Sequence, residues 1–167
     1  MTSQNTINFM KQQGFTEEES LTRAHFVALN FQPRIIGPLV LLGIIFQSPV
    51  VFLALSAALW WSAALPSLNP FETLYNRAIA ITNGQPLLTP APAPRRFAQA
   101  MAGALLLVIG ISLLLGSTFS AYVFEAVMVL SMAVLLFGKF CLASYIYYLL
   151  RGQLSFANST LPWARSR

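Results

Sequence analysis

The most reactive side chains of the sequence lie close together in the segment "FGKFCLASYIYYLLRG", residues 137–152. Lys139 stands two positions before Cys141, which is the only cysteine of the chain. A cation beside a thiol stabilises the thiolate, which is the nucleophilic form. On a regular helix, however, positions i and i+2 do not face each other, and Cys141 aligns with Ser144 and Tyr145 instead. Two interpretations stay open: a reactive thiol, and a small residue packed inside a helix bundle.

Glu125 and Lys139 are the acid and the base of the apolar segment at residues 119–150. They are 14 residues apart, which places them on one helix face but separates them by about 21 Å along the axis, so they are not expected to pair. An ionisable group inside a membrane span is a candidate functional group. The alternative is that each side chain reaches water at its own end of the span, with Lys139 as an interfacial anchor.

A third group of candidate residues, Arg95, Arg96 and Gln99, lies at the start of the apolar segment at residues 97–116. Arginines at the start of a span are suited to bind anionic lipid head groups or the carboxylate of a protein partner. The alternative is that they only mark the cytoplasmic side of the membrane.

Composition limits the class of protein that positions these groups. Hydrophobic residues make up 56% of the chain and charged residues only 9%, whereas soluble domains contain about 25% charged residues. We therefore predict an all-α integral membrane protein. The net charge is +5, but no basic run carries interleaved aromatic residues, so nucleic-acid binding is not expected. One cysteine and one histidine exclude a disulfide within the chain and a Cys- or His-based metal site, and no cofactor is expected.

We predict a bundle of four transmembrane helices arranged as two helical hairpins. The polar turn signal Gln47-Ser48-Pro49 divides the first apolar stretch, and Gly116 begins the turn that divides the second. The first helix is expected to begin before Ile35, because the halves of this stretch are short for a bilayer. The four spans are predicted at about residues 35–47, 49–66, 97–116 and 119–150.

The other segments are predicted to flank this membrane domain, residues 35–151. Residues 1–34 form an N-terminal arm with an amphipathic helix over residues 16–31, and residues 152–167 form a tail. Between the two hairpins, Asn69 and Pro70 are typical of a helix start, so we expect an interfacial helix at residues 70–80.

The basic residues distinguish four spans from three. With four spans, nine of the ten basic residues share one side of the membrane, and the two turns on the other side carry none. This distribution satisfies the positive-inside rule with both termini in the cytoplasm. The nine residues are Lys11, Arg23, Arg34, Arg77, Arg95, Arg96, Arg151, Arg165 and Arg167.

Three motifs carry a resemblance to a known family: "NPFETLYNRAIAI", "PAPAPRRFAQAMAG" and "GKFCLASYIYYLLR". The region from Phe31 to Arg151 resembles a bacterial membrane family catalogued as domain of unknown function 4395. The resemblance implies four spans in the bacterial inner membrane and no established activity. Many members carry Cys-x-x-Cys in the last helix, and some occur near thioredoxin-like proteins. Here Ser144 stands in the place of the second cysteine.

Two functions remain open, and neither requires an enzyme. In the first, the protein is an accessory or structural membrane component that binds a protein partner or lipid. In the second, it is a thiol-linked redox or sulfur-handling component, in which Cys141 forms a mixed disulfide with a thioredoxin-like partner. The bilayer is the expected surrounding in both cases, and assembly into an oligomer is compatible with either.

Overall fold

The structure is a computed structural model that describes residues 3–164, with the side chain of Glu19 left out. The predicted tail at 152–167 therefore lies partly outside the described residues, as do Arg165 and Arg167. Every regular element in the described part is a helix, which confirms the all-α class. The α-helices are α1 (Gln4–Gln12), α2 (Arg23–Leu29), α3 (Phe31–Ile45), α4 (Pro49–Ala64), α5 (Pro70–Tyr75), α6 (Ile81–Asn83), α7 (Ala93–Leu114), α8 (Thr118–Leu136), α9 (Leu142–Leu150) and α10 (Leu154–Ser159).

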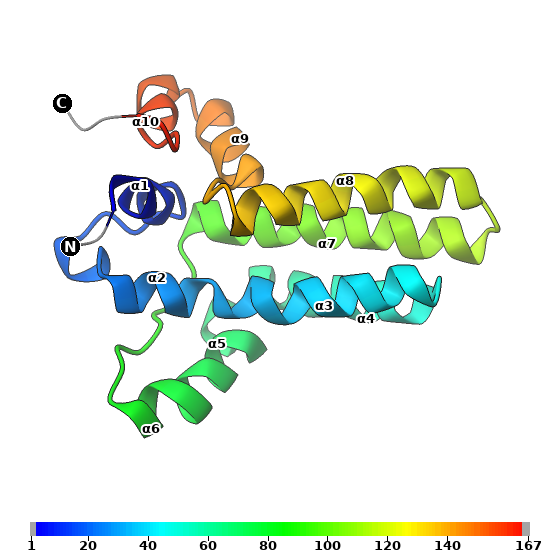
Figure 1. The fold of residues 1–167 in the computed structure, drawn as a ribbon, viewed down its shortest axis with the longest axis horizontal. Coiled ribbons are helices and arrows are strands. Elements are labelled where there is room, and N and C mark those ends of the chain that lie inside the picture. The colour runs from blue at the N-terminus through cyan, green and yellow to red at the C-terminus, as the bar shows by residue number, and fades with distance from the viewer. Residues whose placement is uncertain (1–2, 165–167) are drawn as a thin grey trace.

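Four long helices, α3, α4, α7 and α8, lie side by side along the longest axis of the molecule (Figure 1). Short turns join α3 to α4 and α7 to α8 at one end. The other helices gather at the opposite end, where both termini of the described chain also lie. The chain therefore forms two helical hairpins, α3–α4 and α7–α8, which extend from one common end.

Three helices are long and apolar enough to cross a membrane: Arg23–Ile45, which joins α2 to α3, then α7 and α8. The first begins well before Ile35, as predicted. The apolar helix α4 has 16 residues, or about 24 Å, which is shorter than a hydrocarbon core of about 30 Å. Length and composition thus identify three of the four predicted spans.

Both predicted hairpin turns are present, and each rests on a backbone angle that few residues adopt. Gln47 has φ 45° and Gly116 has φ 69°, both in the left-handed region. Pro49 then opens α4 at a position where its missing N–H costs nothing. Beyond the turns, Gly110 lets α4 approach α7 closely, because a Cβ there would lie 2.9 Å from the Leu53 side chain.

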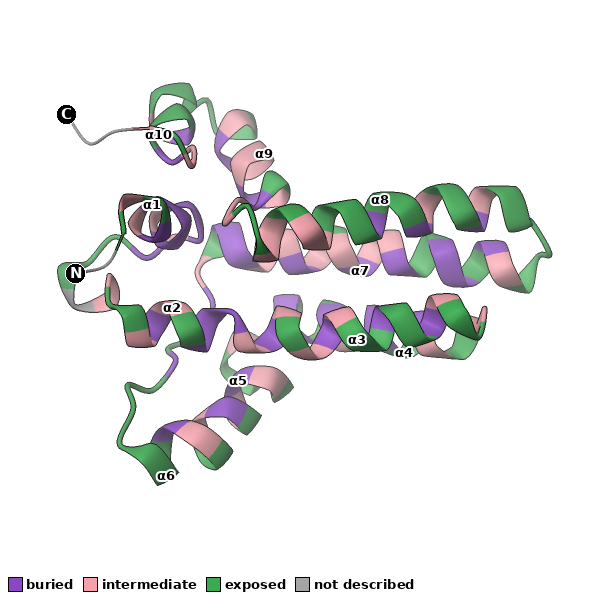
Figure 2. Ribbon diagram, viewed as in Figure 1, coloured by how far each residue is buried: buried purple, intermediate pink, exposed green. Residues whose placement is uncertain are grey.

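The long helices bury one face and expose an apolar one. Phe52, Leu106 and Ile109 are fully buried between them. Exposed residues recur along the outer faces of the long helices (Figure 2), and large apolar side chains there, such as Leu41 of α3 and Leu130 of α8, are 51% and 65% exposed. An outer surface of this kind is suited to lipid tails rather than to water.

The last apolar segment differs from the prediction of one helix over residues 119–150. Helix α8 ends at Leu136, and α9 begins only at Leu142. Between them Lys139 takes φ 51°, and a Cβ on Gly138 would lie 2.7 Å from the Val134 carbonyl oxygen. Because of this break, Lys139 and Cys141 do not lie on one regular helix, and the side-chain alignment predicted for them does not apply.

The arm and the middle loop also differ in detail from the predictions. The helix expected over residues 16–31 begins only at Arg23, and a 3-10 turn at Glu18–Ser20 precedes it. The start lies at Arg23 because Thr22 caps the helix: its hydroxyl oxygen accepts a hydrogen bond from the His25 N–H at 3.2 Å. The helix expected at 70–80 does begin at Pro70. It continues through a π turn, Asn76–Ala80, to Asn83.

Candidate functional site

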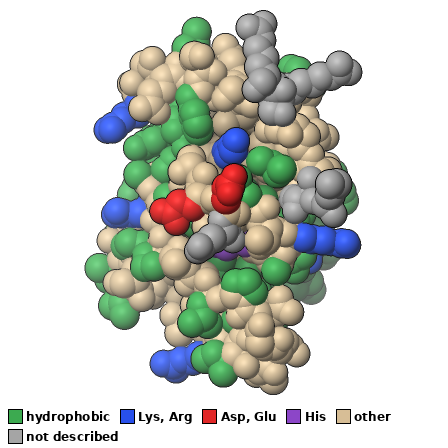
Figure 3. Space-filling model, turned by 90° about the vertical axis from the view of Figure 1, so that its left-hand side faces the viewer, with side chains coloured by type: hydrophobic (Ala, Val, Ile, Leu, Met, Phe, Trp, Pro, Cys, Tyr) green, Lys and Arg blue, Asp and Glu red, His purple; other side chains and the backbone are tan. Residues whose placement is uncertain are grey.

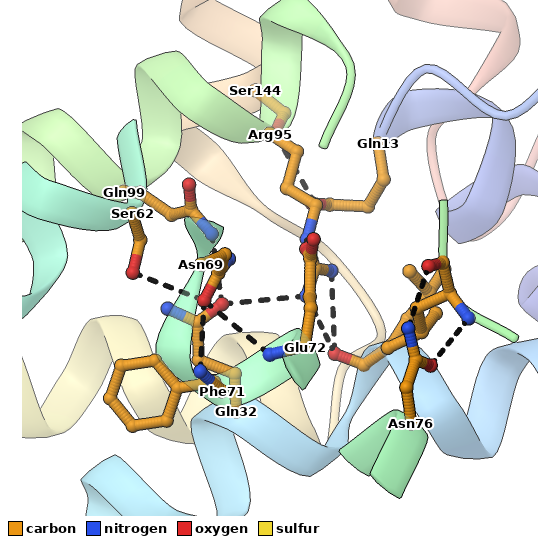
Figure 4. A network of polar contacts seen from close by, with 12 residues as sticks. Gln13, Gln32, Ser62, Asn69, Phe71, Glu72, Asn76, Arg95, Gln99 and Ser144 are labelled. Atoms are coloured by element: carbon orange, nitrogen blue, oxygen red, sulfur yellow. Dashed lines mark hydrogen bonds and ion pairs between the residues drawn. The ribbon is translucent and has the colours of Figure 1, made fainter. Parts of the chain in front are cut away.

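The side chain of Arg95, in the first turn of α7, is buried at the centre of a polar network (Figure 4). Its Nε lies 3.6 Å from Glu72 Oε1 of α5, and this is an ion pair. Its Nη1 and Nη2 both donate to the Leu29 carbonyl oxygen at 3.3 Å, and Nη2 also donates to Gln32 Oε1 at 3.4 Å. One guanidinium therefore joins α7 to α2, α3 and α5.

Glu72 is held in place by the cap of its own helix. Asn69 Oδ1 accepts hydrogen bonds from the backbone N–H groups of Phe71 at 3.0 Å and Glu72 at 3.5 Å, and from Ser62 Oγ of α4 at 3.2 Å. Burial raises the pKa of Glu72 above its ordinary value, and the nearby Arg95 cation acts against this rise.

Two neighbouring amides complete the network, and their orientations follow from Arg95. Because a guanidinium has only donors, the atom of Gln32 that faces it must be the oxygen. Gln99 Nε2 donates to this same oxygen at 2.9 Å. Gln32 Nε2 and Gln99 Oε1 are thereby left over, and both are buried without a hydrogen-bond partner in the described structure.

Cys141 lies where α9 begins, covered by α1. Its backbone N–H donates to Gln12 Oε1 at 2.7 Å, and its side chain is a buried free thiol. One turn later, Ser144 Oγ donates to the Pro94 carbonyl oxygen and accepts from Gln13 Nε2, each at 3.3 Å. Cys141 and Ser144 therefore lie together, at the junction of α1, α7 and α9.

Tyr145, the other residue predicted beside Cys141, turns elsewhere. Its hydroxyl donates to Asn158 Oδ1 of α10 at 2.9 Å, in an exposed contact. Lys139 also turns away from the thiol: its Nζ donates to Thr6 Oγ1 of α1 at 2.9 Å and lies 5.3 Å from the Phe26 ring centre. Arg95 is the only charged residue that borders the same cavity as Cys141 in the described part of the chain.

Glu125 lies buried on α8 and accepts hydrogen bonds from Gln47 Nε2 in the α3–α4 turn, at 3.1 and 3.3 Å. This contact links the two helix pairs near their turns. As predicted, Glu125 and Lys139 do not pair. Each has its own partner on a different part of the chain.

The three residues predicted as one lipid- or partner-binding group lie in two environments. Arg95 and Gln99 belong to the buried network. Arg96 is half-buried, and its Nε donates to the Ala63 carbonyl oxygen of α4 at 2.7 Å. Binding of a lipid head group by Arg96 stays a prediction.

An apolar cavity of about 460 Å³ begins at the network and runs between α3, α7 and α8, and the start of α9 also lines it. Gln32, Arg95, Gln99 and Cys141 all border it, and most other lining residues are apolar. On α7 the lining extends to Val108, about 13 Å along the helix beyond Gln99. The cavity is thus a long apolar space with a polar end.

Several residues of this site were not identified from the sequence. The sequence predicts no site role for Glu72, Gln32 or Gln12. The spacing of Arg95 and Gln99, one helical turn apart, was the available signal for a shared face. Among the described residues, no group of three or more His, Cys, Asp or Glu side chains is placed to hold a metal ion.

We expect Arg95 and Glu72 to be energetically coupled. Arg95→Met should lower the free energy of unfolding by about 3–5 kcal/mol, because it leaves a buried carboxylate unpaired. Adding Glu72→Gln should cost less than the sum of the two single changes, with a coupling of about 0.5–3 kcal/mol. Denaturant unfolding in detergent micelles measures all four proteins, with Arg96→Met as the half-buried control. Strictly additive effects would contradict the pairing.

The same pair predicts a dependence of stability on pH. A carboxyl whose pKa is raised by folding stabilises the fold while protonated. That contribution is complete below the ordinary pKa of 4.5 and is lost as the pH rises through the folded-state pKa. Wild-type melting temperature should therefore fall over this window, and Glu72→Gln should flatten the fall. Arg95→Met removes the cation that opposes the rise, so the fall should extend to higher pH.

The comparisons with known proteins support the resemblance seen in the sequence. Neither a curated protein nor a solved structure matches the chain. The family model described as "Domain of unknown function (DUF4395)" matches residues 27–152, which include Arg95 with its network partners and all of the cavity lining except Phe9 and Gln13. The chain therefore belongs to the DUF4395 family.

Proposed function

We propose that all four long helices cross the bilayer of a bacterial inner membrane, with both termini in the cytoplasm. Helix α4 supports this, because it returns the chain from the far turn to the end where α5 and α6 lie (Figure 1). Its 16 residues are accommodated by local thinning of the bilayer. The end face with the termini carries basic and acidic side chains (Figure 3), whereas the two far turns contain no charged residue. This charge asymmetry favours that end as the cytoplasmic one.

Reporter insertion tests this topology. A reporter active only in the cytoplasm should work after Trp163 and within residues 84–91, and should fail within residues 46–48 and 115–117. A reporter active only outside the cytoplasm should give the inverse pattern. Cytoplasmic activity at 46–48 would contradict four spans and leave α4 as a helix that does not cross.

Within the membrane, the protein acts as an accessory component that binds a lipid-like molecule rather than as an enzyme. The observation that carries this proposal is the apolar cavity between α3, α7 and α8. Several of its lining residues are partly exposed, including Val108 at 39% and Val127 at 46%. The cavity therefore opens on the outer face of the bundle, where an amphiphile could enter sideways from the bilayer.

Co-purification in a mild detergent tests this function. Native mass spectrometry should find one lipid-like molecule on the wild-type protein. Ser131→Trp places a large ring at an exposed lining position and should remove the bound molecule. Ala126→Trp, a similar change on the exposed part of α8 away from the cavity, should retain it. Equal occupancy of the two variants, or an empty wild-type protein, would contradict the proposal.

A thiol-linked function is the second candidate, because Cys141 is a free thiol that borders the cavity. In this reaction the Cys141 thiolate attacks a disulfide of a thioredoxin-like partner. One partner sulfur forms the mixed disulfide, and the other leaves as a thiolate.

Labelling of Cys141 in native membranes tests this candidate. We expect N-ethylmaleimide to react through the cavity and a charged, impermeant maleimide to react slowly. Ser131→Trp should slow the reaction with N-ethylmaleimide, Gln12→Ala should speed it by loosening α1, and Lys139→Ala should leave it unchanged. Labelling only after denaturation would identify Cys141 as a packing residue and exclude the thiol-linked function.

A further inference from the structure

We infer that the cavity selects an amphiphile whose head group is uncharged and carries hydroxyl groups, as in a monoacylglycerol. The inference rests on the proposed lipid-binding function and adds the chemistry of the head group. The inference is drawn from the polar end of the cavity. The tail of an amphiphile is surrounded by apolar material both in the bilayer and in the cavity. Burial of the tail therefore contributes little selectivity, and the head group must supply it.

The first observation is one unsatisfied donor beside one unsatisfied acceptor. Gln32 Nε2 and Gln99 Oε1 are the leftover atoms of two amides that already share a hydrogen bond of 2.9 Å. Both side chains are more than nine-tenths buried, at 5% and 6% exposure, and both border the cavity. A buried polar group without a partner is costly. A hydroxyl both donates and accepts, so a diol head group that displaces the lining side chains around these enclosed atoms satisfies the two together.

The orientation of these amides is fixed by chemistry. Arg95 offers only donors, so Gln32 must present its oxygen to Arg95 and keep its NH2 group free. Gln99 must then present its nitrogen to that oxygen. Reversing either amide would set two donors or two acceptors against each other. The donor–acceptor pair is therefore a consequence of the buried arginine.

The second observation is the charge balance at this end of the cavity. Arg95 is the only charged residue that lines the cavity in the described structure, and its charge is already paired with Glu72. A phosphate or carboxylate head group would therefore be buried with no free cation to balance it. This argues against phospholipids and fatty-acid anions and for a neutral head group.

Competition binding to the full-length protein in nanodiscs tests the inference. Radiolabelled 1-monooleoylglycerol is the probe, with methyl oleate, oleate and an oleoyl lysophospholipid as competitors that share its acyl chain. We expect unlabelled monooleoylglycerol to compete at least tenfold better than each of the others. Gln99→Met should reduce this selectivity about tenfold while binding of methyl oleate is unchanged, which also shows that the variant keeps a folded cavity. Gln13→Met changes another polar lining residue outside the pair and should keep the selectivity.

The outcomes separate this inference from the proposed function. If all four amphiphiles compete equally, or if Gln99→Met keeps the full selectivity, the cavity binds lipid but the head-group inference is wrong. If the charged competitors bind best, the inference is also wrong, and Arg95 acts as an anion site. If no amphiphile binds the wild-type protein, the proposed function itself fails.

Discussion

The buried guanidinium of Arg95 is the constraint on which the rest of the structure depends. A buried charge is tolerated only with a counter-charge and enough hydrogen bonds. Glu72 supplies the first, and Leu29 and Gln32 supply the second. These partners come from separate helices, so the requirement fixes where α5 docks and how α2 continues into α3 beside α7. The middle loop is thereby held against the bundle.

The same constraint creates the polar end of the cavity. Once Gln32 turns its oxygen to Arg95 and Gln99 turns its nitrogen to Gln32, a donor and an acceptor remain with no partner in the described chain. The apolar space beyond them lies between helices whose outer faces are also apolar. A long chain from the bilayer matches this space, and a polar head group matches its end. α1 closes the same region and covers Cys141.

Local features of the fold were predictable from the sequence, and distant contacts were not. The turn at Gln47–Pro49 and the start of α5 at Asn69 follow from short-range rules of turns and caps. The break before Cys141 was not predicted, because one glycine is tolerated in many membrane helices and Lys139 gives no sign of a left-handed backbone. The burial of Arg95 was also not predicted. Arginines at the start of a span are read as topology markers, and no local pattern connects Arg95 with Glu72.

We propose that the space organised by Arg95 holds a lipid-like molecule from the membrane. The most direct measurement is a cryo-electron microscopy structure of the full-length protein, extracted into nanodiscs with its native lipids and enlarged by a bound antibody fragment. We expect elongated density between α3, α7 and α8 that ends within hydrogen-bond distance of Gln32 and Gln99. A cavity filled by side chains, or occupied by water alone at that end, would show that no such molecule is bound.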